Sequence, residues 1–529
     1  MHDTLAVSID AARQQTIGAM LRRTAARLPD KVAIICGQTV WTYAEFNATV
    51  NRLAAGLHRI GARKGDCVAL VSRNSHAFIA LRYALAKLGA IFVPINFMLN
   101  PDEIAYILQN SGARFLAVGP DFVDKVRAAA ALSPSVETLL WLPGEEASVA
   151  PQDIQTFDDI LAAAGPGPAT EVEAEVRSQD ICQIIYTSGT ESRPKGAILT
   201  HEAVMWQYVS CIIDGGMAAD DTVLHSLPLY HCAQLDVNLG PSIYLGTTNV
   251  ITAHPRPDNI LALIRRYQIT SFFAPPTVWI GMLRDPGFDE SLGTLIKGYY
   301  GASIMPVEIL LELQRRRPEL RLWNLYGQTE IAPLATTLQP ADQLERAGSA
   351  GKPVINVETR VVDEDMNDVA VGEIGEIVHR SPQLMSGYYN DPEKTAAAFA
   401  HGWFHSGDLA VVDAQGFISV VDRAKDMIKT GGENVASREV EEAIYRHPAV
   451  EEVAVVGLPD PKWVEAVVAV IVLKSGESAD TDAILKSCGG VLAPYKLPKR
   501  VVFVESLPKN PSGKLLKREL RLRMLEATA

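Results

Sequence analysis

The chain has 529 residues, of which 48% are hydrophobic and 21% are charged. These proportions are typical of a soluble globular protein. A chain of this length exceeds one ordinary hydrophobic core, so we expect two or more domains. The formal net charge of −13 argues against a nucleic-acid-binding protein, which would normally carry a basic surface.

The cysteines and the apolar stretches indicate the compartment. Six cysteines are scattered without a Cys-x-x-Cys pair or a metal-ligand spacing, which predicts reduced and mostly buried thiols. The N-terminus lacks the basic and apolar regions of a signal peptide. The longest apolar candidate, residues 81–99, contains Arg82 and Lys87 and falls short of the roughly 20 residues that span a bilayer. We therefore expect a cytoplasmic protein with no integral membrane segment.

Strand-like and helical patterns alternate from the beginning of the chain. Residues 68–71 and 90–95 have the composition of strands, and residues 77–88 between them have helical spacing. This alternation predicts an α/β fold with largely parallel sheets. Residues 144–177 are rich in Pro, Ala, Gly and acidic residues and are predicted to form a surface excursion before a strand at 181–186.

The pattern begins again after residues 422–425. Ser437 is a plausible N-cap, Glu439 and Glu441 would occupy the first helical turn, and positions 440, 443 and 444 form an apolar face. A strand is predicted at 452–457. The roughly 100 residues in this part are enough for a small α+β domain with its own core. We predict a large domain over residues 1–422, a hinge at 423–427 and a small mobile domain over 428–529.

One segment has the composition of a phosphate-binding loop. Residues 186–196 (YTSGTESRPKG) follow an apolar strand and combine glycine, hydroxyl side chains and Lys195. Glycine lets backbone N–H groups approach an anion, while the hydroxyls and the lysine add donors. The segment is not a Walker A loop, because Lys195 is followed by Gly196 instead of Ser or Thr. Taken alone, it is more often a polar surface loop.

Four further segments follow in a fixed order: residues 324–330 (NLYGQTE), 402–408 (GWFHSGD), 422–428 (DRAKDMI) and 508–514 (PKNPSGK). Together with residues 186–196 they resemble the adenylate-forming superfamily, which activates carboxylates with ATP. Residues 17–525 resemble its acyl-CoA ligase branch. The resemblance implies a large N-terminal α/β domain of packed, mostly parallel sheets with flanking helices, and a small α+β C-terminal lid. It also implies an AMP-forming acid–thiol ligase that uses ATP, Mg²⁺ and CoA.

The resemblance assigns residues to ATP and to the metal. Glu330 would hold Mg²⁺ together with Thr187, since Mg²⁺ binds through few carboxylates plus nucleotide phosphates. Tyr326 offers a face for adenine, Thr329 a hydroxyl for the α-phosphate, and Asp408 a carboxylate for the ribose. The complete ATP or AMP set is Thr187, Ser188, Gly189, Thr190, Lys195, Gly301, Ala302, Ser303, Asn324, Tyr326, Gly327, Thr329, Asp408 and Arg423.

Lys514 resembles the catalytic lysine of the family. A carboxylate attacking an α-phosphate builds up negative charge, and a preorganised cation stabilises it. Lys425 resembles the hinge about which the small domain rotates between adenylate formation and thiol attack. The CoA side would be lined by Lys429, Gly431, Gly432, Glu433 and Trp463.

The sequence departs from the family pattern at three places. Glu191 and Ser192 replace the common Thr-Gly of the phosphate loop, Val464 replaces a glycine, and Ser437 occupies a position that is commonly proline. An acidic residue beside a triphosphate is electrostatically unfavourable unless it points outward or meets a cation. The other two departures touch no reacting group.

The acid-binding pocket is assigned to His231, as a catalytic gate beside the adenylate, and to Cys232, Trp279, Tyr300 and Ile331. Because these walls are mostly apolar, they favour a medium- or long-chain fatty acid over an amino acid. An amino-acid substrate would need an acid near its amine, and Asp236 is the nearby candidate. Chain length is not readable from the sequence.

Several alternatives remain open. They are an aryl- or short-chain-acid CoA ligase, an acyl-AMP ligase that passes its product to another acceptor, a luciferase-like oxygenase, and a nucleotide-binding regulatory protein without activity. The expected partners are small molecules (a carboxylic acid, ATP and CoA), with no nucleic acid. A basic C-terminal tail would allow weak peripheral membrane contact, although a solvated face is the more common role. The oligomeric state stays open, and a homo-oligomer is compatible with the sequence.

Overall fold

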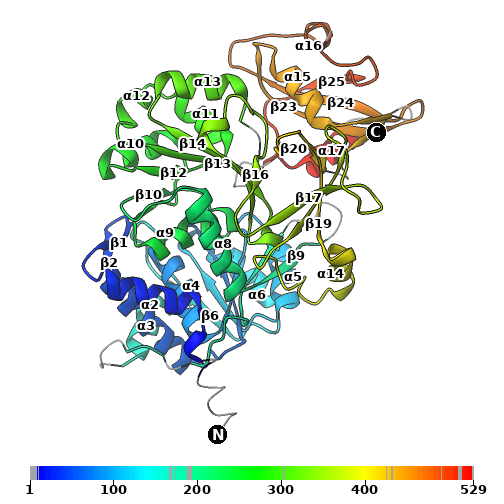
Figure 1. Cartoon of the computed structure of the whole chain (residues 1–529). Helices are drawn as coiled ribbons and strands as arrows, with labels where there is room; N and C mark the ends of the chain where they lie inside the picture. Colours follow the sequence, from blue (N-terminus) through cyan, green and yellow to red (C-terminus); the bar gives the residue numbers. More distant parts are fainter. Residues whose placement is uncertain are drawn as a thin grey trace. The chain divides into compact units, whose positions relative to one another are not determined.

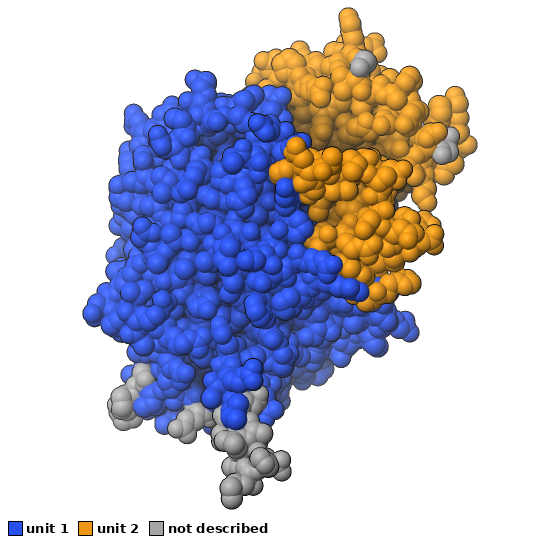
Figure 2. Space-filling model, in the orientation of Figure 1, with its two compact units in different colours: residues 1–358, 380–400 blue, residues 359–379, 401–529 orange. Residues whose placement is uncertain are grey.

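The computed structural model describes residues 9, 11–165, 170–172, 174–187, 193–301, 303, 305–423, 426–430, 433–489, 491–509 and 515–526. The chain divides into two compact units, coloured separately in Figure 2. Unit 1 comprises Met1–Glu358 and Arg380–Ala400, and unit 2 comprises Thr359–His379 and His401–Ala529. The hinge at 423–427 and the boundaries drawn around it stay predictions, and Lys425 lies outside the described residues.

Unit 1 contains a seven-stranded sheet that is parallel except at one edge. Its order is β7 (Gln155–Thr156), β6 (Thr138–Trp141), β5 (Phe115–Val118), β3 (Cys67–Val71), β4 (Ile91–Pro94), β8 (Ile181–Thr187) and β9 (Lys195–Thr200). Only the β8–β9 pair is antiparallel. The predicted strands at 68–71, 90–95 and 181–186 correspond to β3, β4 and β8, which confirms the α/β class.

A nine-stranded sheet completes the framework of unit 1. Its order is β16 (Lys352–Pro353), β15 (Leu334–Leu338), β14 (Arg321–Gly327), β13 (Lys297–Gly301), β12 (Ser271–Phe273), β10 (Thr222–His225), β11 (Thr248–Ile251), β1 (Val32–Cys36) and β2 (Thr39–Thr42). The strands from β14 to β1 are parallel, and the outer strands are antiparallel. In Figure 1, α10, α12 and α13 lie alongside β12–β14.

Helices flank both sheets. They are α2 (Ile17–Arg27), α3 (Tyr43–Arg59), α4 (His76–Leu88), α5 (Pro101–Ser111), α6 (Val123–Ala131), α7 (Phe157–Ala163), α8 (His201–Asp214), α9 (Gly240–Leu245), α10 (Pro257–Tyr267), α11 (Pro276–Arg284), α12 (Phe288–Ser291), α13 (Val307–Arg316) and α14 (Pro392–Ala398). A π-helical segment, η2 (Ala233–Leu239), precedes α9. Short 3₁₀ segments include η3 (Thr329–Ile331).

Helix α4 is buried along its whole length, which explains why it reads as a continuous apolar run. Ser75 caps its N-terminus by accepting a hydrogen bond from the Phe78 N–H, and Gly89 ends it in the left-handed conformation (φ 71°). Its two cations are neutralised inside the protein: Lys87 pairs with Glu171 at 2.7 Å, and Arg82 pairs with Asp236.

Two predictions for local structure need correction. Residues 144–177 are more than a surface excursion, because they include β7 and α7. Helix α7 packs closely on α3, since a Cβ at Gly56 would lie 1.9 Å from the carbonyl oxygen of Ile160. Ser437 is not an N-cap: α15 begins at Ser437 itself, and both its N–H and its hydroxyl donate to Asp422, each at 2.7 Å.

Unit 2 contains two mainly antiparallel sheets. One has the order β17 (Glu358–Val362), β18 (Gly375–Arg380), β19 (Phe404–Val412) and β20 (Ile418–Arg423), with Glu358 and Arg380 falling at the unit boundary. The other has the order β22 (Glu433–Val435), β21 (Ile428–Thr430), β24 (Val464–Leu473) and β23 (Val450–Asp460), and β25 (Arg500–Phe503) runs parallel to β24. Its helices are α15 (Ser437–Tyr445), α16 (Thr481–Cys488) and α17 (Lys517–Glu526).

The last part of the C-terminal basic segment forms helix α17, on which Arg518 and Arg523 are exposed, as expected for a solvated face. Leu520 and Met524 of α17 are buried against β23 and β24, and Lys517 pairs with Glu441 at 2.8 Å. All six cysteines are free and buried, as predicted. No helix within the described part of the chain is long and apolar enough to cross a membrane.

Candidate active site

The predicted phosphate loop joins two paired strands of unit 1. Thr187 at the end of β8 stands opposite Lys195 at the start of β9. Gly196 is required at its position, because a Cβ there would lie 2.7 Å from Ile184 and 3.0 Å from the Tyr186 ring. Ser188, Gly189 and Thr190 lie outside the described residues, as does Glu191. The strand pairing therefore fixes where Lys195 leaves the sheet.

Tyr388 links the predicted phosphate cation to the predicted metal ligand. Its hydroxyl donates to Glu330 Oε1 at 2.9 Å, and Lys195 Nζ lies 4.9 Å from the centroid of its ring. Burial, with the Glu330 carboxylate adding to it, raises the pKa of Tyr388 above its ordinary value. The phenol thus remains a hydrogen-bond donor at neutral pH. Its hydroxyl holds Glu330, while its ring makes a cation–π contact with Lys195.

Sequence reasoning missed Tyr388. The segment that carries it, residues 385–391, pairs with β9 through hydrogen bonds from Ser386 N to Ile198 O (3.0 Å) and from Ile198 N to Gly387 O (3.0 Å). The available signal was a glycine followed by two tyrosines, Gly387-Tyr388-Tyr389, after a strand. That signal predicts a turn, but it does not reveal which earlier residues the tyrosines contact.

The segment around Glu330 is shaped by a close backbone approach. Gly327 has φ 156°, and a Cβ there would lie 1.8 Å from the Pro333 carbonyl oxygen. The backbone carbonyl of Glu330 accepts from the Met385 N–H at 2.8 Å. Thr329 and Glu330 are buried, each 8% exposed. Within the described residues no group of three or more His, Cys, Asp or Glu side chains forms a metal cluster. A single buried carboxylate fits Mg²⁺ that takes its other ligands from phosphates and water.

The predicted acid-binding segment meets the predicted α-phosphate segment. Cys232 Sγ lies 3.2 Å from Thr329 Oγ1, although the two residues are 97 positions apart. His231 Nδ1 accepts from the Ala233 N–H at 3.1 Å, so the ring proton belongs on Nε2. Burial raises the pKa of Cys232 to about 12, so its thiol stays neutral. These contacts bring His231, Cys232 and Thr329 to one place.

The remaining predicted pocket residues lie in two separate buried clusters. Ile331 packs with Leu325 and other residues around η2, whereas Trp279 and Tyr300 belong to the core beneath β12 and β13. The Trp279 indole donates to Tyr299 O at 3.1 Å, and the Tyr300 hydroxyl donates to Gln343 at 2.6 Å. Their role as acid-pocket walls stays a prediction.

The segments at 299–303 and 324–330 become neighbouring parallel strands. Tyr300 pairs with Asn324, and Gly301 pairs with Leu325. Gly301 is needed for this approach, since a Cβ would lie 2.4 Å from the Leu325 carbonyl oxygen. Asn324 is buried and donates to Ser349 O at 2.8 Å. Tyr326 is the penultimate residue of β14, Ser303 is exposed, and Ala302 lies outside the described residues.

In unit 2 the two predicted ribose residues come together. Asp408 on β19 pairs in register with Arg423 on β20, and Arg423 Nε lies 3.1 Å from Asp408 Oδ1. Asp408 is 5% exposed, and its N–H donates to Ser406 Oγ at 3.0 Å. The arrangement is a preorganised carboxylate with an adjacent guanidinium. Its assignment to a ribose stays a prediction.

The predicted CoA residues lie on two hairpins of unit 2. Lys429 and Glu433 are exposed on β21 and β22, while Gly431 and Gly432 between them lie outside the described residues, as does Lys514. Trp463 precedes β24, with Lys462 Nζ and Lys499 Nζ at 4.9 and 5.0 Å from its ring. Val464 has φ 70°, a conformation that favours glycine, which is the residue expected there from the family pattern.

Comparison with known proteins decides the family. Residues 21–389 match the AMP-binding enzyme family, and residues 439–514 match the AMP-binding enzyme C-terminal domain. The chain belongs to the AMP-binding enzyme family. Within this family it lies in the acyl-CoA synthetase branch of the adenylate-forming superfamily, and it is an AMP-forming acid–CoA ligase.

Relatives in this family include ligases for different acids. The chain is 38% identical to a feruloyl-CoA synthase of Amycolatopsis sp, with 97% of this chain and 99% of the relative covered. It is 36% identical to a long-chain-fatty-acid–CoA ligase of Mycobacterium tuberculosis, with 96% and 98% covered. An anthranilate CoA ligase in complex with anthranoyl-AMP has a TM-score of 0.89 at 28% identity, with 98% of both chains covered. The similarity therefore extends over nearly the whole given chain.

Proposed function

We propose that this ligase activates a compact aromatic carboxylic acid as its acyl-AMP and transfers the acyl group to CoA. The observation that carries the proposal is the set of contacts joining Lys195, Tyr388 and Glu330, next to the Cys232–Thr329 contact. These contacts join, within unit 1, the cation that we assign to phosphate, the carboxylate that we assign to the metal and the segment that we assign to the acid. Adenylate formation requires groups that bind the carboxylate, the phosphates and the metal close together.

Each residue has a defined part in the first half-reaction. Lys195 and the Thr329 hydroxyl receive phosphate oxygens. Glu330, oriented by Tyr388, would hold Mg²⁺, which would supply positive charge to neutralise the phosphates. The substrate carboxylate oxygen attacks the α-phosphorus, the bond to the bridging oxygen breaks, and pyrophosphate leaves. Lys514 stabilises the charge that builds up on the carboxylate and phosphate oxygens, while Asp408 and Arg423 receive the ribose.

The second half-reaction consumes the adenylate. The thiolate sulfur of CoA attacks the acyl carbonyl, the bond between the carbonyl carbon and the phosphate oxygen breaks, and AMP leaves. His231 lies beside Cys232 and Thr329, where the adenylate would sit in this proposal, and it closes the acid side against water. Lys429, Glu433 and Trp463 flank the thiol approach, and rotation about Lys425 exchanges the two states.

A buried polar network favours a compact acid over a long alkyl chain. Asp236 lies four residues after Cys232, about one turn along η2, and it pairs with Arg82. Gln183 Nε2 donates to Asp236 at 2.7 Å, and Arg82 donates to the Tyr208 hydroxyl at 2.9 Å. A long apolar tail that followed η2 inward would have to displace or further desolvate these charged groups, which is costly.

The same network argues against an amino-acid substrate. Asp236 was the nearby acid suited to an α-amine, and its carboxylate is already engaged by Arg82 and Gln183. The relatives that act on feruloyl and anthranoyl groups support an aromatic acid. The fatty-acid ligase relative, together with the apolar pocket residues, supports the alternative of a medium- or long-chain fatty acid.

A panel of acids tests the substrate class. Initial rates of AMP release would be measured with benzoic, cinnamic and arylacetic acids and with straight-chain acids of increasing length, at fixed ATP and CoA. We expect the highest kcat/KM on an aromatic acid, and a higher value on long-chain acids would contradict this part of the proposal.

A double variant tests the reason for the preference. Arg82→Met with Asp236→Leu removes both charges together, which is tolerated far better than removing one. It is expected to gain activity on longer straight chains relative to aromatic acids. Asp236→Leu alone serves as the matched comparison, because it leaves Arg82 buried without its partner. An unchanged chain-length profile in a folded double variant would show that the network does not limit the pocket.

A further inference from the structure

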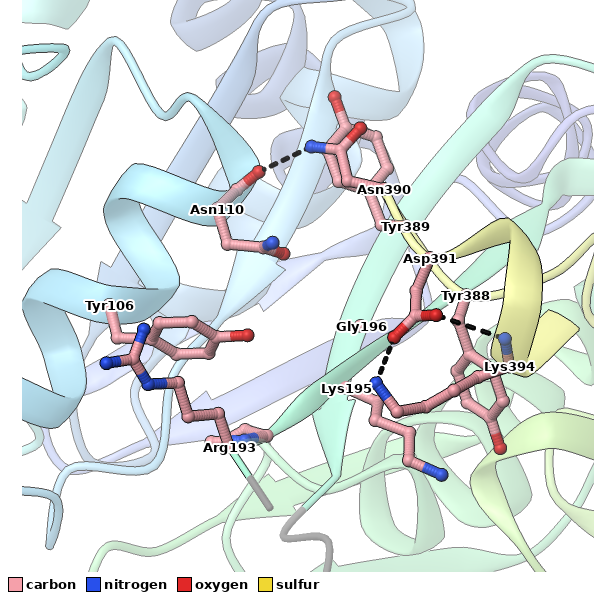
Figure 3. A pocket seen from close by; sticks show the side chains of 11 residues that line it. Tyr106, Asn110, Arg193, Lys195, Gly196, Tyr388, Tyr389, Asn390, Asp391 and Lys394 are labelled. Atoms are coloured by element: carbon pink, nitrogen blue, oxygen red, sulfur yellow. Dashed lines mark hydrogen bonds and ion pairs between the residues drawn. The ribbon is translucent and has the colours of Figure 1, made fainter.

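A cavity of about 280 Å³ opens beside Lys195, on the side where α5 and α14 lie. Figure 3 shows the side chains that line it. They come from α5 (Tyr106, Asn110), from the residue two positions before β9 and the first residue of β9 (Arg193, Lys195), from the segment before α14 (Tyr388, Asp391) and from α14 itself (Lys394). All of these residues belong to unit 1, and none except Lys195 was assigned a role by the sequence.

The lining of the cavity is positively charged, whereas the chain as a whole is negatively charged. Three cations, Arg193, Lys195 and Lys394, face one carboxylate, Asp391, so the lining carries a formal charge of +2 in a chain whose net charge is −13. Neighbours hold these groups in place: Arg193 lies 5.1 Å from the Tyr106 ring centroid, and Asp391 accepts from the Lys394 N–H at 3.1 Å and from its ammonium group. Convergent cations in a concave site are the chemistry that binds phosphate groups.

Hydrogen bonds within the walls form a firm frame for the cavity. The Asn110 carbonyl accepts from Asn390 Nδ2 at 3.0 Å, and Asn110 Oδ1 accepts from the Tyr186 hydroxyl at 2.6 Å, which ties α5 to β8 and to the segment before α14. The Tyr389 N–H donates to Gly196 O at 2.8 Å. The cavity volume is many times what one water molecule needs. It is therefore a built space and large enough for an anion of several heavy atoms.

We propose that this cavity is a binding site for the pyrophosphate that leaves after adenylate formation. The proposal rests on the proposed function, because the reaction must produce pyrophosphate. Lys195 lines the cavity and also belongs to the phosphate loop, so its ammonium group can contact phosphate oxygens in either site. Breaking the bond between the α-phosphorus and the bridging oxygen puts the new charge on pyrophosphate. Arg193 and Lys394 then offer that charge two further cations, away from the adenylate.

The same chemistry would also suit the terminal phosphates of bound ATP. The two sources differ in a measurable way: a site for the leaving group affects pyrophosphate alone, whereas a site for ATP affects both ligands in parallel. Asp391 and Lys394 carry opposite charges, so substituting one should raise the affinity for pyrophosphate and substituting the other should lower it. General damage to the fold cannot change the affinity in opposite directions.

Lys394→Gln removes one cation and releases the Asp391 carboxylate. Binding of inorganic pyrophosphate, measured by calorimetry on the full-length protein without acid or CoA, is expected to weaken about tenfold, equivalent to about 1.4 kcal/mol. Asp391→Asn removes the carboxylate, keeps a good N-cap for α14, and should strengthen pyrophosphate binding several-fold. Arg315→Gln, an exposed arginine on α13, is the control with the same change of charge and is expected to bind pyrophosphate as the parent does.

ATP affinity, measured in the same way, decides between the two sources. Opposite shifts in pyrophosphate affinity with ATP affinity changed less than about twofold would support the proposal. Parallel shifts for both ligands would assign the cavity to the terminal phosphates of ATP and overturn it, and unchanged pyrophosphate binding in both variants would overturn it as well. These binding measurements need no turnover. If the enzyme released no AMP with any acid, the proposed function would be refuted, while the pyrophosphate-binding result would still be measured independently.

Discussion

Tyr388 offers the sharpest test of how the site is held together. Replacing it by phenylalanine removes the 2.9 Å hydrogen bond to Glu330 but keeps the ring beneath Lys195. A hydrogen bond to a charged group contributes about 1.5–3 kcal/mol. Tyr388 is only partly buried, so the lower end applies, which corresponds to about a tenfold loss of affinity. We expect Tyr388→Phe to raise the KM for ATP–Mg²⁺ about tenfold.

The assay measures initial rates against ATP at several concentrations of free Mg²⁺. If Glu330 holds the metal, high Mg²⁺ should recover part of the lost activity of Tyr388→Phe. Tyr389→Phe is the matched control, because the backbone of Tyr389 makes the contact with Gly196. A lower Tm with an unchanged KM for ATP would mean that Tyr388 is only structural, and an equal effect in Tyr389→Phe would refute the reasoning.

Three further predictions follow from other parts of the chain. Lys514→Ala should reduce adenylate formation by orders of magnitude while thioester formation from preformed acyl-AMP survives, and Lys425→Pro should do the reverse; equal loss in both half-reactions would contradict the two-state assignment. Val464→Gly should stabilise unit 2 by about 1 kcal/mol in chemical denaturation, because a β-branched residue at φ 70° is strained. Val464→Ala keeps a Cβ and its strain, so it should raise the free energy of unfolding by less. Equal increases in the two variants would refute the explanation. Burial lowers the pKa of His225 to about 4 from the ordinary 6.5, so the unfolded chain binds the proton more readily than the folded protein does. The contribution of His225 to stability is therefore complete above pH 6.5 and is lost as the pH falls toward 4. His225→Gln should make the free energy of unfolding depend less steeply on pH between 6.5 and 4, and an unchanged slope would contradict this.

Local sequence patterns predicted much of the framework. The strands β3, β4 and β8 and the helix α4 follow from apolar runs bounded by turn and capping residues. Asp408 pairs with Arg423, and β13 lies beside β14, so segments that the sequence assigns to one ligand are neighbours within their unit; the assignments themselves stay predictions. These features could be predicted because each depends on residues close in sequence or on a family pattern.

Contacts between distant side chains could not be predicted. Asp236 pairs with Arg82 across 154 positions, and Tyr388 reaches Glu330 across 58. Neither pair leaves a periodic or spacing signal. Ser437 shows the same limit: its sequence position suits an N-cap, but Asp422 offers its side chain a stronger, charged acceptor.

The most direct test of the central claim is to follow one turnover with a suitable aromatic acid, ATP and Mg²⁺, and then to add CoA. The account predicts enzyme-bound acyl-AMP and pyrophosphate before CoA is added, and AMP with acyl-CoA in equal amounts afterwards. Formation of ADP, or thioester formation without an adenylate intermediate, would contradict it.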